Sequence, residues 1–108
     1  MSVDAARSER RPERPSAPET RRRLEHARST GLTQLRALEE SGREGDELMS
    51  AQRVAVEQVL KEIGAAFARV EDGAYGSCLG CGQTIPDERL EILPYTRYCV
   101  PCQRRAAG

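Results

Sequence analysis

Two Cys-x-x-Cys pairs near the C-terminus constrain this chain more than any other feature. Cys78 and Cys81 form the first pair, Cys99 and Cys102 form the second, and seventeen residues separate the pairs. Each pair lets a tight turn present two thiolates to one ion, and the spacing falls within the range of four-cysteine zinc sites. Four thiolates would fill the tetrahedral coordination of Zn²⁺ and leave no position for water or substrate. We therefore expect one structural Zn²⁺ per chain.

Two disulfides, free thiols or a rubredoxin-like iron site are the alternative states of these cysteines. The first residues of the chain contain no apolar segment typical of a secretory signal, and no stretch approaches the roughly 20 apolar residues that span a bilayer. We therefore expect a cytoplasmic protein without membrane association. In a reducing cytosol, cysteine pairs favour metal binding over disulfides.

The composition limits the size of any hydrophobic core. Of 108 residues, 38% are hydrophobic and 4% are aromatic, and tryptophan is absent. Chains this small commonly depend on a metal, on disulfides or on a partner for stability. The 17 basic and 17 acidic side chains cancel, so no global field attracts the chain to nucleic acid, and any electrostatic recognition must be local.

A first helix is predicted after the arginine-rich leader. Ser16-Ala-Pro-Glu19 fits a capping box with a proline in the first turn. Apolar residues then follow at spacings of three and four, as expected for one narrow helix face: Leu24, Ala27, Gly31, Leu35 and Leu38. Because glycine weakens a helix interior, we expect a local kink at residues 29–31.

A second helix is predicted from Asp46, which can cap it, to Asp72, with Gly73 as its stop. Its apolar residues repeat mainly every seven positions, which is a heptad pattern: Met49, Val56, Ile63 and Val70, with Leu60 and Phe67 between them. A five-residue turn at 41–45 would make the two helices an antiparallel hairpin.

The expected fold is therefore mainly α. Residues 1–18 are predicted to be a disordered tail, because their composition cannot bury enough apolar surface to offset chain entropy. Residues 19–72 are predicted to form a coiled-coil hairpin, and residues 73–108 a small four-cysteine zinc-finger module.

A few other side chains could carry chemistry. His26 stands alone on a polar helix face, and we expect it at the surface rather than bound to a metal. Tyr75, Tyr95 and Tyr98 could stack on bases, but in a zinc module tyrosines more often shield the cysteines. The sequence shows no Ser/His/Asp set, glycine-rich phosphate loop or paired buried carboxylates, so we expect no enzyme activity.

Residues 69–103 carry a set of motifs around the cysteines. These are Arg69-Val-Glu-Asp-Gly-Ala-Tyr-Gly-Ser-Cys78, Cys81-Gly82, Ile85, Arg89-Leu90-Glu91, Pro94 and Cys99-Val-Pro-Cys102. This pattern resembles the DksA/TraR zinc-finger family. The resemblance implies a bacterial transcription regulator whose hairpin enters the secondary channel of RNA polymerase while the finger rests on the channel rim. Such a protein would bind core polymerase as a monomer and change open-complex stability without sequence-specific DNA contact.

The resemblance also gives a role to the turn between the helices. Family members carry D-x-x-D-x-A at this tip, near the active-site Mg²⁺ of the polymerase. Here Asp46-Glu-Leu-Met-Ser-Ala51 lacks the second acid, and Glu44-Gly-Asp-Glu47-Leu-Met49 lacks the alanine. Glu44, Asp46 and Glu47 are therefore candidate partner-binding residues. The alternative is an ordinary solvated turn whose acids cap a helix.

Two further positions depart from the family pattern. Longer members often carry a basic residue before the proline, where this chain has Leu93, and the last cysteine is followed here by Gln103. The resemblance therefore does not transfer a guanosine tetraphosphate response to this chain.

Three functions fit the sequence. The leading hypothesis is the polymerase-binding transcription regulator. A zinc-ribbon nucleic-acid binder is the second, although residues 73–108 hold only four arginines against three acids, which is a weak electrostatic footprint. A coiled-coil adaptor unrelated to polymerase is the third.

Overall fold

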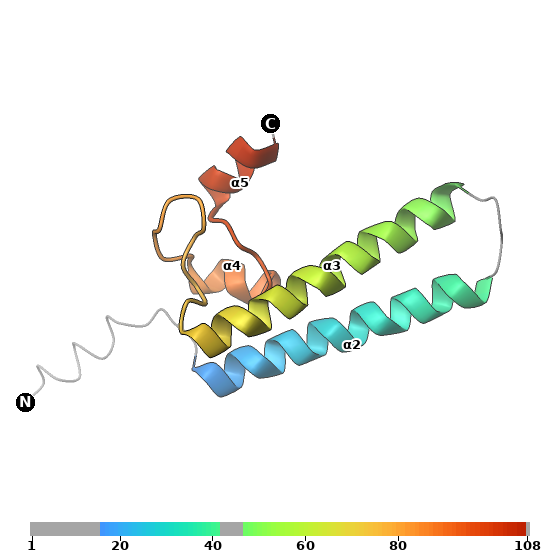
Figure 1. Cartoon of the computed structure of the whole chain (residues 1–108), viewed down its shortest axis with the longest axis horizontal. Coiled ribbons are helices and arrows are strands. Elements are labelled where there is room, and N and C mark those ends of the chain that lie inside the picture. The colour runs from blue at the N-terminus through green and yellow to red at the C-terminus, as the bar shows by residue number, and fades with distance from the viewer. Residues whose placement is uncertain (1–15, 42–46, 108) are drawn as a thin grey trace, which may run out of the picture.

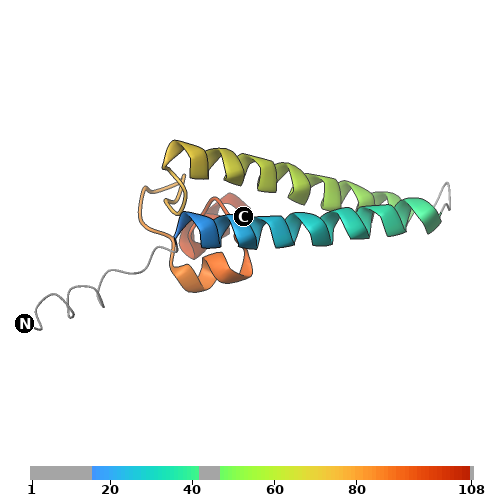
Figure 2. The same cartoon turned by 90° about the horizontal axis from the view of Figure 1, so that it is seen from below.

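The fold is a two-helix rod with a small module at one end. The computed structural model describes residues 16–41 and 47–107. Within this part of the chain the helices are α2 (Ala17–Ser41), α3 (Glu47–Asp72), α4 (Asp87–Ile92) and α5 (Val100–Ala107). Figures 1 and 2 show α2 and α3 side by side along the rod, with α4, α5 and the intervening loops gathered at the end where α2 begins. The predicted mainly-α hairpin is confirmed. None of the helices described is both long and apolar enough to cross a membrane.

The seam of the rod contains the predicted apolar faces of both helices. Leu24, Ile63 and Ala66 are fully buried at the base of the rod, the end that carries the module. Farther along, the predicted seam residues are only half-buried: Leu35, Leu38, Met49 and Val56. Complete burial of a Leu or Ile side chain stabilises by about 1.5–3 kcal/mol. The base of the hairpin is therefore its best-stabilised part.

The start of α2 differs from the predicted boundary. The helix begins at Ala17, two residues inside the predicted tail, because the Ser16 hydroxyl oxygen accepts a 3.2 Å hydrogen bond from the Glu19 amide. This bond satisfies one of the amides that a helix start leaves without a partner, and Pro18 is tolerated in the first turn. Residues 1–15 of the predicted tail lie outside the described residues.

The predicted kink at residues 29–31 is wrong, because α2 continues through Gly31 as one helix. Gly31 is buried, and a Cβ atom at this position would lie 2.9 Å from Cδ2 of Leu60 on α3. The glycine therefore allows the two helices to approach closely. Packing between α2 and α3 at this point keeps α2 helical at residues 29–31, where the intrinsic helix preference is weak.

The ends of α3 follow the sequence signals where the structure describes them. The helix ends at Asp72, and Gly73 follows with a φ of +75°. The amide of Ala74 donates a 2.9 Å hydrogen bond to the carbonyl of Arg69, which closes the helix end. At the other end α3 begins at Glu47. The predicted cap Asp46 and residues 42–45 of the turn lie outside the described part.

Candidate metal centre

The first cysteine pair lies in a tight turn between two short extended segments. Ser77 and Thr84 form an antiparallel bridge, and the amide of Cys78 donates to the carbonyl of Gln83 at 2.8 Å. Inside this turn the amide of Gly82 donates back to the carbonyl of Cys78 at 2.8 Å, with Gly82 at a φ of +79°. Only glycine adopts this left-handed backbone without strain. The turn therefore brings the sulfur atoms of Cys78 and Cys81 close to each other.

The second cysteine pair lies at the start of α5. Cys99 immediately precedes the helix, and Cys102 lies in its first turn. The amide of Gln103 donates to the carbonyl of Cys99 at 2.9 Å, which fixes the turn between the two thiols. The amide of Leu79 donates to the carbonyl of Arg97 at 2.8 Å. This last bond joins the two cysteine-bearing segments.

The four predicted ligands come together. The sulfur atoms of Cys78, Cys81, Cys99 and Cys102 all lie within 4.8 Å of one another, and the Cys81 and Cys99 sulfurs are 3.8 Å apart. A tetrahedral Zn²⁺ with bonds of about 2.3 Å requires sulfur–sulfur edges of about 3.8 Å. The cysteines are free thiols rather than disulfides. The arrangement fits one four-coordinate, thiolate-bound metal ion.

Backbone and side-chain donors surround the sulfurs. The amides of Gly80 and Cys99 each donate to Cys78 Sγ at 3.3 Å, and Nη2 of Arg105 donates to Cys102 Sγ at 2.9 Å. Burial alone would raise the pKa of the Cys78 thiol, but the N–H groups that point at its sulfur lower this pKa to about 6. Burial and the neighbouring thiols raise the pKa of Cys102. The N–H donors thus favour the thiolate form, which binds metals, at Cys78.

A small apolar cluster encloses the two buried cysteines. Ile85 and Leu90 are buried together with Cys78 and Cys102, and Tyr75 and Tyr98 pack against this cluster. Tyr75 and Tyr98 therefore lie against the cysteines, as the sequence predicted. Tyr95 packs instead on the core at the base of the rod, which Tyr75 also touches.

Long side chains fix the module to the rod. Nη2 of Arg69 on α3 donates to the carbonyls of Tyr95 and Thr96 at 3.3 and 3.4 Å. Arg23 on α2 forms ion pairs with Asp87 and Glu91 of α4 at 3.1 and 3.5 Å. These arginine contacts were not predicted, because nothing local in the sequence relates Arg23 to partners more than 60 positions away.

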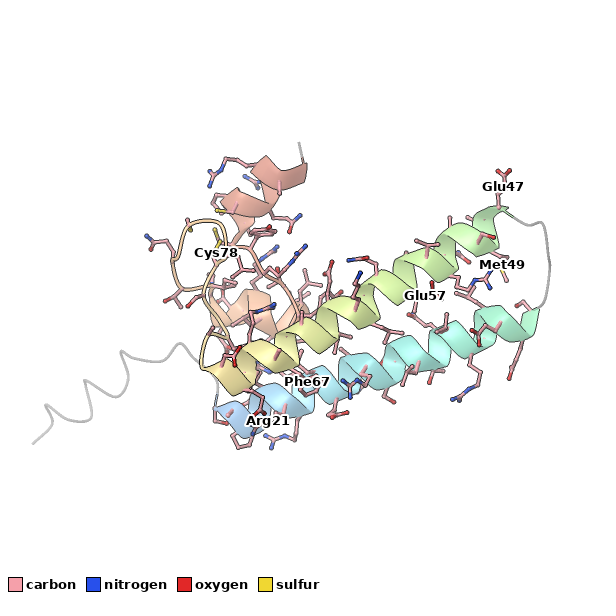
Figure 3. All side chains as sticks on the ribbon, viewed as in Figure 1. Arg21, Glu47, Met49, Glu57, Phe67 and Cys78 are labelled. Atoms are coloured by element: carbon pink, nitrogen blue, oxygen red, sulfur yellow. The ribbon has the colours of Figure 1, made fainter. Side chains whose placement is uncertain are left out.

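The remaining residues that the sequence singled out and the structure describes do not point at the cysteine cluster. His26 is exposed, as predicted. Glu47 is exposed at the far end of the rod from Cys78 (Figure 3). Glu44 and Asp46 lie outside the described residues. Leu93 and Gln103 line one shallow hollow together with Glu62, Arg89, Tyr95, Thr96 and Arg97.

Comparison with known families agrees with this geometry. Residues 73–106 match the family described as prokaryotic dksA/traR C4-type zinc finger. Residues 73–106 thus resemble a DksA/TraR zinc finger. This finger contains all four clustered cysteines as well as α4 and most of α5. The family match therefore covers the C-terminal module and does not extend over the hairpin.

Two curated relatives share part of the chain. An uncharacterized protein of Aquifex aeolicus is 49% identical over 43 residues, which cover 40% of this chain and 30% of the relative. General stress protein 16O of Bacillus subtilis is 46% identical over 46 residues, or 43% of this chain and 28% of the relative. The match thus spans less than a third of the length of each relative. Among solved structures, transcription factor DksA2 from Pseudomonas aeruginosa aligns with a TM-score of 0.47 and 25% identity, covering 84% of this chain and 77% of that one.

Proposed function

We propose that this protein is a bacterial transcription regulator that binds RNA polymerase through its secondary channel. The observation that carries the proposal is a DksA/TraR finger seated at the base of a two-helix rod. With 26 residues and a rise of 1.5 Å per residue, α3 is about 39 Å long. A rod only two helices thick suits a narrow channel. We propose that the finger rests on the rim while the rod projects inward.

The finger supplies a rigid base for that rod. We propose that Cys78, Cys81, Cys99 and Cys102 hold one Zn²⁺, which would join the two cysteine pairs and leave no open coordination position. The buried cluster around Leu90 and the hydrogen bonds from Arg69 would then transmit this rigidity to the hairpin. The role of the metal is structural, and the protein acts as a regulator rather than as an enzyme.

The charges of the finger favour a protein partner over nucleic acid. Nε of Arg89 donates to the carbonyl of Tyr98 at 3.0 Å, and Arg97 lies 3.8 Å from a Glu62 oxygen. Arg105 is engaged with a cysteine sulfur. Three of the four arginines in residues 73–108 thus make contacts within the chain. Because few basic groups are left to neutralise phosphates and the net charge is zero, non-specific DNA binding should be weak.

The tip of the rod would change the open complex. Glu47 lies at the opposite end of α3 from the finger (Figure 3), and Glu44 and Asp46 directly precede it in the sequence. Carboxylates carried into a channel would face a metal-bearing site of low dielectric, where each charge matters more than in water. We propose that affinity comes from the finger and the sides of the rod, and that the acidic tip alters open-complex stability without contacting specific DNA sequences.

Retention of purified protein on immobilised core RNA polymerase tests the proposal. Wild-type protein should be retained, and Cys78→Ser/Cys102→Ser should lose retention because the finger no longer folds. Glu47→Gln, which removes one exposed charge at the far end of the rod from the cysteines, is the matched control and should be retained like wild type. Tight duplex-DNA binding with a steep salt dependence, and no retention on polymerase, would favour the nucleic-acid binder. Failure to bind either would favour the adaptor.

A further inference from the structure

Arg23 forms ion pairs with three carboxylates at the base of the rod. Its Nη2 atom lies 3.0 Å from Glu19 and 3.5 Å from Glu91, and its Nη1 atom lies 3.1 Å from Asp87. Only 17% of the Arg23 side chain is exposed. One largely covered arginine side chain therefore holds three carboxylates, whose own side chains are 45% (Glu19), 34% (Asp87) and 57% (Glu91) exposed.

These carboxylates belong to two different parts of the fold. Glu19 lies one turn before Arg23 on α2, whereas Asp87 and Glu91 lie one turn apart on α4. Between them, Leu90 points the other way and is buried against Cys78 and Cys102. Helix α4 has six residues and is too short to be stable alone. The position of α4 therefore depends on the cysteine module. The positions of the Asp87 and Glu91 carboxylates depend on it as well.

A second ion pair on the same helix provides a contrast. Arg21 lies 3.3 Å from Glu71 of α3, but these side chains are 46% and 70% exposed. Exposed pairs of this kind contribute little to stability, because water and salt screen them. The Arg23 side chain is better covered than that of Arg21, and its partners lie on both α2 and α4, so the loss of the α4 carboxylates should have a larger local effect.

We infer that Arg23 is a positioning residue that couples occupancy of the metal centre to the order of the first turns of α2. The inference rests on the proposed metal site. Without the ion the cysteine module loosens, α4 no longer presents Asp87 and Glu91, and Arg23 is left with Glu19 alone. The first turns of the hairpin then fray. By linkage the dependence is reciprocal, so the loss of Arg23 must also weaken metal binding.

Hydrogen exchange of the full chain, loaded with Zn²⁺ and then treated with a chelator, tests this coupling. In wild type, chelation should speed exchange in residues 17–24 as well as in α4. In Arg23→Gln, residues 17–24 should exchange fast with zinc bound and respond little to the chelator. Arg21→Gln is the matched control and should behave like wild type. Competition with a chelator should show zinc affinity reduced roughly fivefold or more in Arg23→Gln, and close to wild type in Arg21→Gln.

Asp87→Asn provides a second variant, because it keeps Arg23 and removes one α4 carboxylate from the network. It should reproduce the effect of Arg23→Gln in weaker form. If wild type and both variants bind zinc, and residues 17–24 exchange at the same rate in all three proteins, the coupling is wrong. The metal site itself would remain supported. A wild-type chain that binds no zinc would overturn the metal site and the coupling together. Retention on polymerase is measured separately and does not enter this test.

Discussion

The hydroxyl of Tyr75 donates a 2.7 Å hydrogen bond to the carbonyl of Pro94. This bond joins the segment that leaves the hairpin to the segment that leads into the second cysteine pair. We predict that Tyr75→Phe lowers the free energy of unfolding by about 1 kcal/mol, or more if the buried Pro94 carbonyl finds no other donor. Urea unfolding of the zinc-loaded protein measures the change. A variant as stable as wild type would show that water replaces the bond.

The same tyrosine predicts an alkaline effect. Burial raises the pKa of Tyr75 to about 12, whereas an unfolded chain has a tyrosine pKa of about 10. Between these values the folded state keeps the proton that the unfolded state has lost, so stability decreases as pH rises. The stability advantage of wild type over Tyr75→Phe should therefore shrink as the pH rises from about 10 to about 12. An advantage that is constant or grows with pH would contradict the prediction.

Metal analysis should find one equivalent of Zn²⁺ per chain. Because the site does not exist in the unfolded chain, the free energy of metal binding is also free energy of folding for this module. Chelation should therefore unfold the module with α4 and α5, while much of the circular dichroism signal from the longer α2 and α3 remains. A preparation with less than about half an equivalent of zinc, whose spectrum does not respond to a chelator, would refute the site.

Gly64 is a helix-interior glycine without a packing role. It lies in the interior of α3 and is exposed, and no atom beyond its chain neighbours and the nearby backbone of the same helix lies within 4 Å of the position that a Cβ would take. Gly64→Ala should raise the free energy of unfolding by about 0.5–1 kcal/mol, because alanine loses less backbone entropy in a helix. Gly31→Ala is the contrasting variant and should gain less, since Leu60 must first move away. Thermal unfolding of both variants provides the comparison.

Removal of the tip charges should separate regulation from binding. Asp46→Asn/Glu47→Gln removes two charges, and asparagine can still cap a helix. The double variant should lose its effect on open-complex lifetime while its retention on core polymerase stays close to that of wild type. Glu57→Gln removes one exposed charge midway along the rod, away from the tip (Figure 3), and at saturating concentration should keep the wild-type effect on open-complex lifetime. A fully active double variant would show that the rod acts by occupancy alone.

Elements that depend on neighbouring residues could be predicted from the order of amino acids. Apolar spacing identified the seam from Leu24 to Leu38 on α2 and from Met49 to Val70 on α3, because a 3.6-residue period places such residues on one face. Gly73 marked the end of α3, and the two Cys-x-x-Cys spacings marked the four sulfurs that the structure brings together. Each of these signals acts over a few residues, so the order of residues is sufficient to predict it.

The tertiary structure decided the features that depend on residues far apart in the chain. Gly31 looked like a kink, but packing against Leu60 keeps α2 continuous. No local signal singled out Arg23, but α4 brings Asp87 and Glu91 to it. The physical reason is the same in both cases. Local preference in a helix amounts to about 1 kcal/mol or less per residue, and burial and compensated charge between distant segments outweigh it.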